Sequence, residues 1–499
     1  MDGVSPDFDI SSINDVGTHE SLPSLTTTEF SWSQWIGLGA AFALLFSVLT
    51  WVPVNHNLNA HQRATLAVTL WACTVWISNA LPKAVSGLSI PVLLYITGAT
   101  SKTVAFQGFT SNTSLLVIGS LLMASALHAR HLDRRIALGI ISWAKPKLPS
   151  FLKAYIVAQT ITALMIPAIV ARAAIFLPIV QGTNTLLENS EKGRRARQAM
   201  CMSAVGFAAV FAGPLFLTGS MPNVIVAYQL NHQAQAHIFW FQWFWLNLPL
   251  IGLIPIMYFW TLRHFKIHDV GFRNGPETIA KERARLAPLN LIDKLSLTVF
   301  GLAVVFWATG RWTHIPTGMV AVGAACLLFF PGILAGFWHR IERHMMWGVW
   351  LLLGGAICMS NAFTTTKTNV WLSHQLQHFF PSAGWLGLLV LAMVTVQVLR
   401  IGIVSNVGSI ALFTPIIVTL AINLHLNPVS FSMGVLNVDS YALLIPLEIE
   451  ACLVAYASGE FTFKEFFKAG APLTAIALVY MVVVMVPWWA LIGYPVWQA

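Results

Sequence analysis

The distribution of apolar and polar residues along this 499-residue chain is that of a membrane protein. Apolar runs of about twenty residues recur from residue 32 onward, and a run of that length can cross a bilayer as a helix. The expected uninterrupted spans cover residues 32–52, 64–80, 85–96, 114–129, 239–262, 295–309, 319–337, 347–362 and 469–491. With the interrupted spans described next, we expect an all-α polytopic protein with about eleven transmembrane helices.

One long apolar stretch starts and ends on the same side of the membrane. It lies between Lys153 and the basic cluster that begins at Lys192, and it contains Pro167, Arg172 and Pro178. Basic flanks are cytoplasmic by the positive-inside rule, so the chain must enter and return. Two short spans would satisfy this, but the internal prolines and arginine favour a re-entrant hairpin over about residues 154–185.

A second stretch, residues 386–420, has a small polar centre between apolar flanks. The centre is S-N-V-G-S at residues 405–409. Polar groups at that depth are tolerated where they are buried in protein or line a cavity, as at the broken helices of transporters. The alternative is a membrane helix with a small polar packing face. We interpret the stretch as a second hairpin, entered from outside.

Each hairpin is followed by an interrupted span. Residues 202–228 contain T-G-S-M-P-N at 218–223, and residues 435–458 are broken near Pro446. Glycine and proline interrupt a helix and free backbone groups to face a ligand. Two halves with this order, entered from opposite faces, predict two inverted-topology repeats. The expected organisation is a tail at 1–31, a first repeat at 32–262, a linker at 263–290 and a second repeat at 291–499.

Composition and charge support this interpretation. Only 9% of the residues are charged, against about 25% in soluble domains. The net charge of +9 does not indicate nucleic-acid binding, because the basic residues lie in short loops between spans. Residues 1–31 are acidic, rich in Ser and Thr and free of Lys and Arg, which predicts a disordered cytoplasmic tail and no targeting peptide. Residues 364–381 are polar with little positive charge, which predicts an external loop.

Metal and catalytic motifs are missing from the sequence. The five cysteines are scattered through apolar segments without a CxxC pair, and the histidines show no HExxH spacing. No Gly-rich phosphate loop or G-x-S-x-G motif occurs. We therefore expect no metal site and no enzyme activity.

Four motifs together resemble one transporter family. They are W-G-V-W-L-L-L-G-G at 347–355, D-R-R-I-A at 133–137, the break at 218–223 and the tip at 405–409. The last two are similar to G-T-P-P-N and S-N-T-A-T in the divalent-anion/sodium symporter family, the dicarboxylate, tricarboxylate and sulfate carriers. The resemblance implies an elevator-type homodimer in the lipid bilayer that binds a small anion. It implies no cofactor other than sodium or a proton as the coupling ion.

The resemblance, together with the charged residues Arg172, Glu448 and Glu450 that depart from it, gives the candidate site residues. The expected substrate-binding residues are Ser405, Asn406, Gly408, Ser409, Pro222, Asn223, Ser220 and Arg172. The expected ion-coupling residues are Asn406, Thr218, Gly219, Glu448 and Glu450.

This chain departs from the family pattern at both tips and at the second break. In the family, both tips carry S-N-T and are thought to hold sodium and the substrate carboxylates. Here the first tip is A-I-V at residues 168–170, the second has Val407 for Thr, and the second T-P-P-N is replaced by I-E-A-C at 449–452.

The intramembrane charges lead to two hypotheses. A charge at the bilayer centre costs at least about 2.5–3.5 kcal/mol, so it needs a partner or a role. In the first hypothesis, Arg172 replaces the sodium charge and binds the substrate carboxylate, and coupling passes to protons on Glu448 or Glu450 or to exchange. In the second, Arg172 forms a structural ion pair with these glutamates. Arg400 is expected to reach toward the outer surface.

The sequence thus predicts secondary active transport of di- or tricarboxylates, with the loss of the first S-N-T tip pointing away from sodium coupling. The alternatives are a sulfate carrier of the same fold and a non-transporting membrane sensor or scaffold derived from a carrier. The topology suits a multi-pass protein of a bacterial inner membrane with a cytoplasmic N-terminus.

Overall fold

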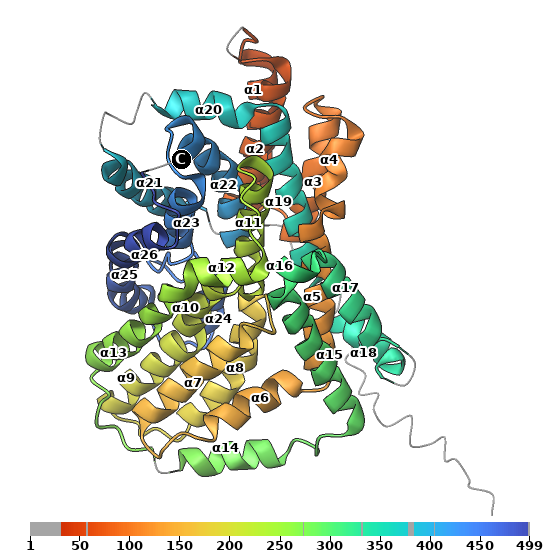
Figure 1. Cartoon of the computed structure of the whole chain (residues 1–499). Coiled ribbons are helices and arrows are strands. Elements are labelled where there is room, and N and C mark those ends of the chain that lie inside the picture. The colour runs from red at the N-terminus through yellow and green to blue at the C-terminus, as the bar shows by residue number, and fades with distance from the viewer. Residues whose placement is uncertain are drawn as a thin grey trace, which may run out of the picture.

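The structure is a computed structural model that describes residues 31–55, 58–272, 274–330, 333–377, 384–403 and 405–497. The regular secondary structure of these residues is helical, apart from a single bridge between Lys147 and Gly271 (Figure 1). The all-α fold expected from the apolar runs is therefore confirmed. The tail predicted at residues 1–31 lies, except for Ser31, outside the described residues.

The first half of the chain contains the first hairpin and the first broken helix. Its helices before the hairpin are α1 (Trp32–Trp51), α2 (Ala60–Ser78), α3 (Lys83–Ile96), α4 (Lys102–Thr110), α5 (Asn112–Ala129) and α6 (Leu132–Ile141). The hairpin and the elements that follow it are α7 (Leu148–Thr162), α8 (Ile169–Asn184), α9 (Glu191–Ala199), η2 (Met200–Phe207), α10 (Ala208–Ala212), η3 (Gly213–Leu215), η4 (Leu217–Gly219), α11 (Met221–Gln233), α12 (Trp240–Asn247), η5 (Leu248–Gly252) and α13 (Leu253–Phe265).

The second half repeats this order after a helical linker. Its first helices are α14 (Gly275–Ala284), α15 (Leu291–Ala308), α16 (Gly310–Thr313), α17 (Thr317–Leu328), η6 (Ala335–Phe337), α18 (Trp338–His344), α19 (Trp347–Thr365) and α20 (Thr368–Gln377). The hairpin and the remaining elements are α21 (Trp385–Arg400), α22 (Asn406–Asn423), α23 (Pro428–Asp439), α24 (Glu450–Tyr456), α25 (Phe463–Tyr480), η7 (Met481–Met485) and α26 (Val486–Leu491).

The two hairpins approach each other from opposite ends of the molecule. In Figure 1 the α7–α8 hairpin lies in the lower half, and α21 and α22 lie in the upper half. Helix α22 packs on α23, α11 and α19, while α24 packs on α8 and η2. Each half of the chain therefore supplies one hairpin to a shared centre, and the half-helix α24 of the second repeat completes the first hairpin's surroundings.

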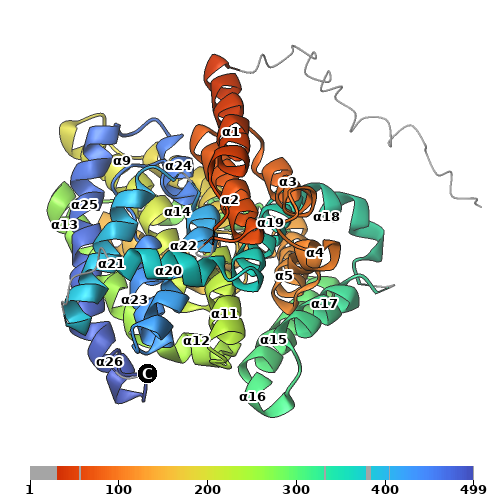
Figure 2. The same ribbon diagram turned by 90° about the horizontal axis from the view of Figure 1, so that it is seen from above.

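The remaining helices form a second group beside the hairpins. Helices α3 and α4 pack on α19, and α5 packs on α17, so both halves of the chain contribute to this group (Figures 1 and 2). Glycines let the backbones touch: a Cβ atom on Gly355 would lie 2.0 Å from the carbonyl oxygen of Gly87. The diglycine of the 347–355 motif thus serves close packing of α19 on α3.

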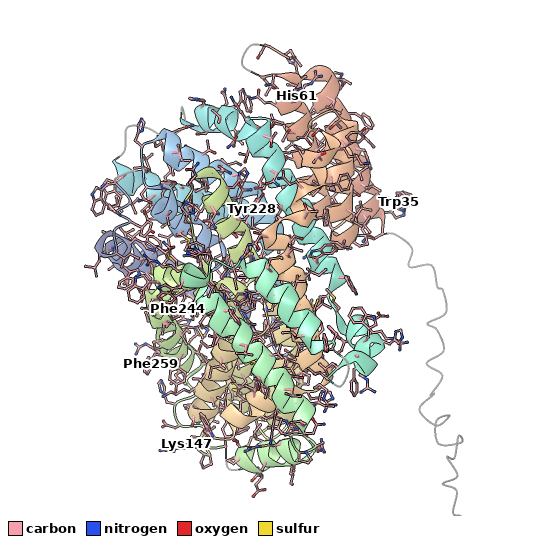
Figure 3. All side chains as sticks on the ribbon, turned by 45° about the vertical axis from the view of Figure 1, so that its right-hand side comes forward. Trp35, His61, Lys147, Tyr228, Phe244 and Phe259 are labelled. Carbon is pink, nitrogen blue, oxygen red and sulfur yellow. The ribbon has the colours of Figure 1, made fainter. Side chains whose placement is uncertain are left out.

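The surface of the helices is that of an integral membrane protein. Eight helical segments among the described residues are long and apolar enough to span a bilayer, and four shorter apolar helices accompany them, including α8 and α21. Large apolar side chains such as Trp35 and Phe259 project outward (Figure 3) and are 57% and 63% exposed. Apolar exposure on this scale is typical of a lipid-facing surface. The chain is a multi-pass membrane protein.

Two segments expected to be loops contain helices instead. Helix α14 lies within the charged linker at 263–290, and α20 lies within the polar segment at 364–381. The four residues Glu277, Lys281, Glu282 and Arg283 make α14 polar on most sides, so it carries no apolar run that would have revealed a helix.

Candidate functional site

The tip of the first hairpin is apolar and lacks a side-chain cap. Helix α7 ends at Thr162 and α8 begins at Ile169, so the tip predicted at residues 168–170 lies at the start of α8. Ala168 occupies the N-cap position and cannot accept a hydrogen bond through its side chain. The first-turn N–H groups of α8 are consequently left without a capping side chain.

The tip of the second hairpin is polar and capped. Helix α21 ends at Arg400 and α22 begins at Asn406. The N-cap residue Ser405 accepts a hydrogen bond from the Gly408 backbone N–H at 3.2 Å. One turn later, the Ser409 hydroxyl donates to Asp439 Oδ2 at 3.0 Å. Ser405 and Ser409 therefore organise this tip locally.

The two tip helices can be aligned residue by residue. Pro178 in α8 and Pro415 in α22 each lie ten positions after the N-cap of their helix. In this alignment Ile169 corresponds to Asn406, and Arg172 corresponds to Ser409. The first tip has thus lost the Asn of the second tip and has an arginine where the second has a serine.

Arg172 is fully buried and is surrounded by backbone carbonyls. Its Nη1 donates to the carbonyl oxygens of Ile166 at 3.1 Å and Gly219 at 2.8 Å, and its Nη2 donates to Ala209 at 2.8 Å. These three carbonyls belong to the hairpin tip, the break before α11 and the helix α10 that precedes the break. The guanidinium thus ties the first tip to the first broken helix.

Arg400 makes the equivalent connection in the second half. It is also fully buried, and it donates to the carbonyl oxygens of Ile403 and Glu448. Ile166 and Ile403 each lie two residues before the N-cap of their tip helix. Gly219 and Glu448 each directly precede the N-cap of the half-helix that follows the break. Two arginines from different hairpin arms therefore occupy matching cages of carbonyl oxygens.

The third contact differs between the cages. Where Arg172 has the Ala209 carbonyl, Arg400 has the carboxylate of Asp439, with Nε and Oδ1 3.6 Å apart. That separation is an ion pair rather than a hydrogen bond. Both side chains of this pair are fully buried.

Two sequence expectations about these arginines are wrong. Arg400 does not reach toward the surface, because carbonyls and Asp439 hold it inside. Arg172 forms no ion pair with Glu448 or Glu450 among the described residues; carbonyl oxygens compensate its charge instead.

The first break is held by side-chain bonds within its own loop. The Asn223 amide donates to the carbonyls of Gly213 and Phe216 at 2.9 and 2.8 Å. The Thr218 hydroxyl accepts from Trp240 Nε1 at 3.1 Å. Pro222 lies in the first turn of α11, where a missing N–H is harmless. Thr218, Gly219 and Asn223 therefore shape the loop rather than face open space.

The two glutamates at the second break have different surroundings. Glu448 folds back on its own loop, and its Oε2 accepts from the N–H groups of Leu444 at 2.8 Å and Ile445 at 3.2 Å. Glu450, the first residue of α24, pairs with Lys83 of α3, with 3.0 Å between Oε1 and Nζ. Glu450 is thus directed away from the arginine cages.

A cavity of about 170 Å³ lies where the two hairpin tips meet; we call it the tip cavity. It is lined by Lys83, Pro167, Ala168, Ile169, Val170, Ser220, Met221, Pro222, Met346, Val349, Leu352, Asn406, Val407 and Glu450. Of the expected site residues, it brings together Asn406, Ser220, Pro222 and Glu450. The structure thus joins both tips, both breaks and the neighbouring helices α3 and α19 around one space.

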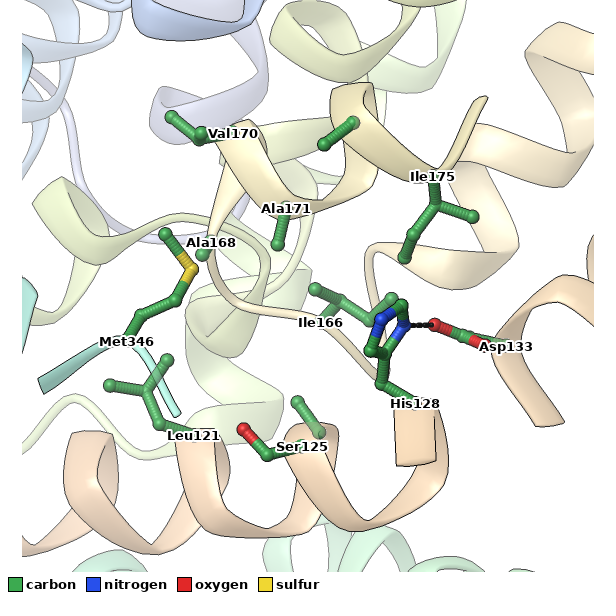
Figure 4. Close-up of a pocket in the computed structure, with 12 residues that line it drawn as sticks. Leu121, Ser125, His128, Asp133, Ile166, Ala168, Val170, Ala171, Ile175 and Met346 are labelled. Atoms are coloured by element: carbon green, nitrogen blue, oxygen red, sulfur yellow. Dashed lines mark hydrogen bonds and ion pairs between the residues drawn. The ribbon is translucent and has the colours of Figure 1, made fainter. Parts of the chain in front are cut away.

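A larger cavity of about 350 Å³ adjoins the other side of the first tip. It shares Ala168, Val170 and Met346 with the tip cavity (Figure 4). On its far wall His128 Nδ1 and Asp133 Oδ2 are 2.7 Å apart. Residues of the apolar first tip therefore form part of the wall between the two cavities.

The tip cavity has the electrostatics of an anion site. The first residues of α3, α8, α11 and α22 line it: Lys83, Ile169, Met221 and Asn406. Each helix N-terminus carries roughly half a positive charge, and the Lys83 ammonium, which is paired with the Glu450 carboxylate, lies among the four of them. Asn406 is 3% exposed, and its buried Oδ1 atom has no hydrogen-bond partner within the part of the chain that the structure describes. Its amide is therefore free to bind a guest in the cavity.

Several expected residues do not line the tip cavity. The residues that are not part of its wall are Arg172, Ser405, Gly408, Ser409, Asn223, Thr218, Gly219 and Glu448. Gly408 has a packing role instead, because a Cβ atom there would lie 2.6 Å from the Trp76 ring.

Sequence reasoning missed two charged residues of this region, Lys83 and Asp439. Lys83 lies between the expected spans at 64–80 and 85–96, where a lysine in a short loop is common and gives no signal of a site. Asp439 is a lone acid in an apolar segment, and that isolation was the signal that could have revealed it.

Comparisons with known proteins agree with this architecture. Residues 32–494 match the family described as the sodium:sulfate symporter transmembrane region. A sodium-dependent dicarboxylate transporter, SdcS, of Staphylococcus saprophyticus is 23% identical, with 89% of each chain covered. An uncharacterized transporter of Haemophilus influenzae is 26% identical over 91% of this chain and 95% of its own.

A solved structure has a similar fold. The crystal structure of the Alcanivorax borkumensis YdaH transporter superposes with a TM-score of 0.52 and 12% sequence identity. The match covers 87% of this chain and 99% of that one. At this identity the likeness concerns the fold alone.

Proposed function

The chain belongs to the sodium:sulfate symporter family, and from that premise we propose that it carries small divalent organic anions, di- or tricarboxylates, across a membrane. The tip cavity supports this proposal most directly. It joins four helix N-termini, the Asn406 side chain and the Lys83 ammonium, which pairs with Glu450, around about 170 Å³. Such a cavity stabilises carboxylates and disfavours cations. The dicarboxylate transporters among the relatives favour the same substrate class.

We further propose that transport does not require sodium. A guanidinium already occupies the carbonyl cage beside each tip, at Arg172 and at Arg400. A sodium ion bound there would have to displace a permanently charged group. In this proposal Arg172 positions the first tip and does not bind the substrate. Coupling then falls to protons on Glu448 or Glu450, or transport is exchange.

We propose an elevator mode of transport, which the grouping of the helices supports. Both hairpins, both broken helices and their neighbours would move as one body against the group that contains α3 and α19, as an elevator. A homodimer formed through that second group would keep it fixed in the bilayer. The basic loops favour a cytoplasmic N-terminus, and the bacterial origin of the named relatives favours a bacterial inner membrane.

A second candidate substrate is sulfate. The name of the family favours it, and the helix N-termini that suit a carboxylate also suit an inorganic dianion. The apolar side chains Val349, Leu352 and Val407 in the cavity wall favour a substrate with a carbon skeleton.

Competition for uptake separates these possibilities. Full-length protein in proteoliposomes would be supplied with labelled succinate, and unlabelled succinate, citrate or sulfate would be added in excess; empty liposomes are the control. We expect succinate or citrate to abolish uptake and sulfate to leave most of it. Uptake of labelled sulfate by the same proteoliposomes, without uptake of labelled succinate, would identify a sulfate carrier. Binding of an anion without flux, with or without a proton gradient or internal anion, would indicate a sensor.

A further inference from the structure

The ion pair between Lys83 and Glu450 lies in the wall of the tip cavity and joins residues that are far apart in the sequence. Lys83 begins α3, Glu450 begins α24, and their Nζ and Oε1 atoms are 3.0 Å apart. They are the only charged residues among those described in the wall. The Lys83 and Glu450 side chains are 38% and 21% exposed, so the pair is accessible from the cavity.

We propose that Glu450 is a built-in competitor of the transported anion, which displaces it from Lys83 on binding. This inference rests on the proposed function and names the residue that the substrate carboxylate would contact. In the empty site the Glu450 carboxylate occupies the position of a substrate carboxylate, at the one ammonium group of the cavity wall. On binding, a carboxylate of the anion replaces the Glu450 carboxylate as the partner of Lys83.

The geometry makes this exchange feasible. A partly exposed lysine–glutamate pair contributes little net stability, because water competes for both charges. A second anionic group therefore need not overcome a strong bond. The Glu450 carboxylate, once released, remains partly exposed to water and is not left in an apolar interior.

The rest of the cavity favours the incoming anion over Glu450. A free dianion can contact Lys83 with one carboxylate and reach the Asn406 amide and the N-terminus of α22 with the other. Glu450 makes no hydrogen bond to Asn406 within the described residues. Glu450 thus pairs with Lys83 but leaves the Asn406 side chain and the N-terminus of α22 available to the anion.

The pair also cancels the charge of the Lys83 ammonium in the empty cavity. Without Glu450 the lysine would hold any small anion, and release would be slow. With Glu450 present, the departing anion is replaced by a tethered carboxylate that is always nearby. The expected consequence is a lower affinity for substrate and a faster release.

Binding of labelled succinate and citrate to the purified full-length protein tests this assignment. We expect Glu450→Gln to bind the anion roughly three- to tenfold more tightly than wild type, and Lys83→Gln to bind it at least about tenfold more weakly. In the double variant the gain from Glu450→Gln should vanish, because the glutamate acts only through Lys83. Glu460→Gln is the matched control, since Glu460 pairs with Arg197 at 3.2 Å and does not line the cavity.

The outcomes distinguish the two proposals. Unchanged or weaker binding by Glu450→Gln, with wild type binding normally, overturns the competitor assignment alone. Tighter binding that persists in the Lys83→Gln background overturns it as well, because it indicates general repulsion. Absence of binding and uptake in both wild type and Glu450→Gln overturns the proposed function too. Melting temperatures verify folding, and Glu450→Ala replaces the glutamine variant if the latter does not fold.

Discussion

The two hairpin tips have the same architecture and opposite chemistry. Each is the start of a helix with a proline ten positions after the N-cap, and each is tied to a broken helix by a buried arginine. The second tip presents Ser405 and Asn406, whereas the first presents Ala168 and Ile169. The first tip has thus kept the geometry of a binding element without its polar side chains.

The two halves of the chain differ in the groups that compensate the charge of the buried arginine. Among the described residues, Arg172 is compensated by carbonyl dipoles alone, and Arg400 by two carbonyls and the Asp439 carboxylate. A buried cation among carbonyls resembles a coordinated ion. A buried cation beside a carboxylate is an ion pair, whose members depend on each other. The two cages should therefore respond differently when the arginine is removed.

The largest effect is expected for Arg400→Ala. The change leaves Asp439 buried without a cation and two carbonyls without a donor, which we expect to destabilise the protein by about 3–5 kcal/mol. Uptake should be lost, and the melting temperature in detergent should fall strongly. Adding Asp439→Asn should recover part of the stability, because the uncompensated charge disappears. No recovery in the double variant would contradict an ion pair in this cage.

A smaller loss is expected for Arg172→Ala. Among the described residues only carbonyls lose their partner here, and water that enters the vacated volume can hydrogen-bond to them, so we expect a loss below the about 3–5 kcal/mol of Arg400→Ala. Asp439→Asn should give no recovery in this background, since Asp439 belongs to the other cage. Fluorescence-detected melting of both double variants measures the contrast. Recovery of Arg172→Ala by Asp439→Asn would show that the two cages are not independent.

The polar and apolar tips should differ in their effect on substrate. Asn406→Ala removes a donor from the tip cavity and should raise the KM for uptake roughly tenfold or more, because a hydrogen bond to a charged group is lost. Ile169→Ala, at the matching position of the first tip, is the control and should leave KM nearly unchanged. Equal effects of the two substitutions would mean that the second tip has no special role in binding.

The smallest change in stability is expected for substitutions at the N-caps of the two tip helices. Ser405→Ala should destabilise the protein by about 1 kcal/mol through loss of the bond to the Gly408 N–H, and Ala168→Ser should stabilise the first tip by a similar or smaller amount. Paired melting curves measure both shifts. A stabilising Ser405→Ala would exclude a capping role for that serine.

The sequence predicted the fold because a helix that crosses the bilayer must have an apolar surface, so that each span appears as an apolar run. The hairpins followed from Pro167, Arg172 and Pro178 and from the polar centre at 405–409, all of which conflict with a continuous lipid-facing helix. The site was predicted only in part. Lys83 and Glu450 are 367 positions apart, and nothing local marks them as partners. Arg400 ends an apolar run, a pattern that a surface arginine and a buried one share.

The most direct test of the central claim compares succinate uptake with and without sodium. Proteoliposomes containing the wild-type protein would be assayed with sodium on both sides, and with sodium fully replaced by choline. Our account predicts equal initial rates, because Arg172 and Arg400 already supply the cations beside the tips. Uptake that occurs only in the presence of sodium would contradict it, and would mean that sodium binds outside the two arginine cages.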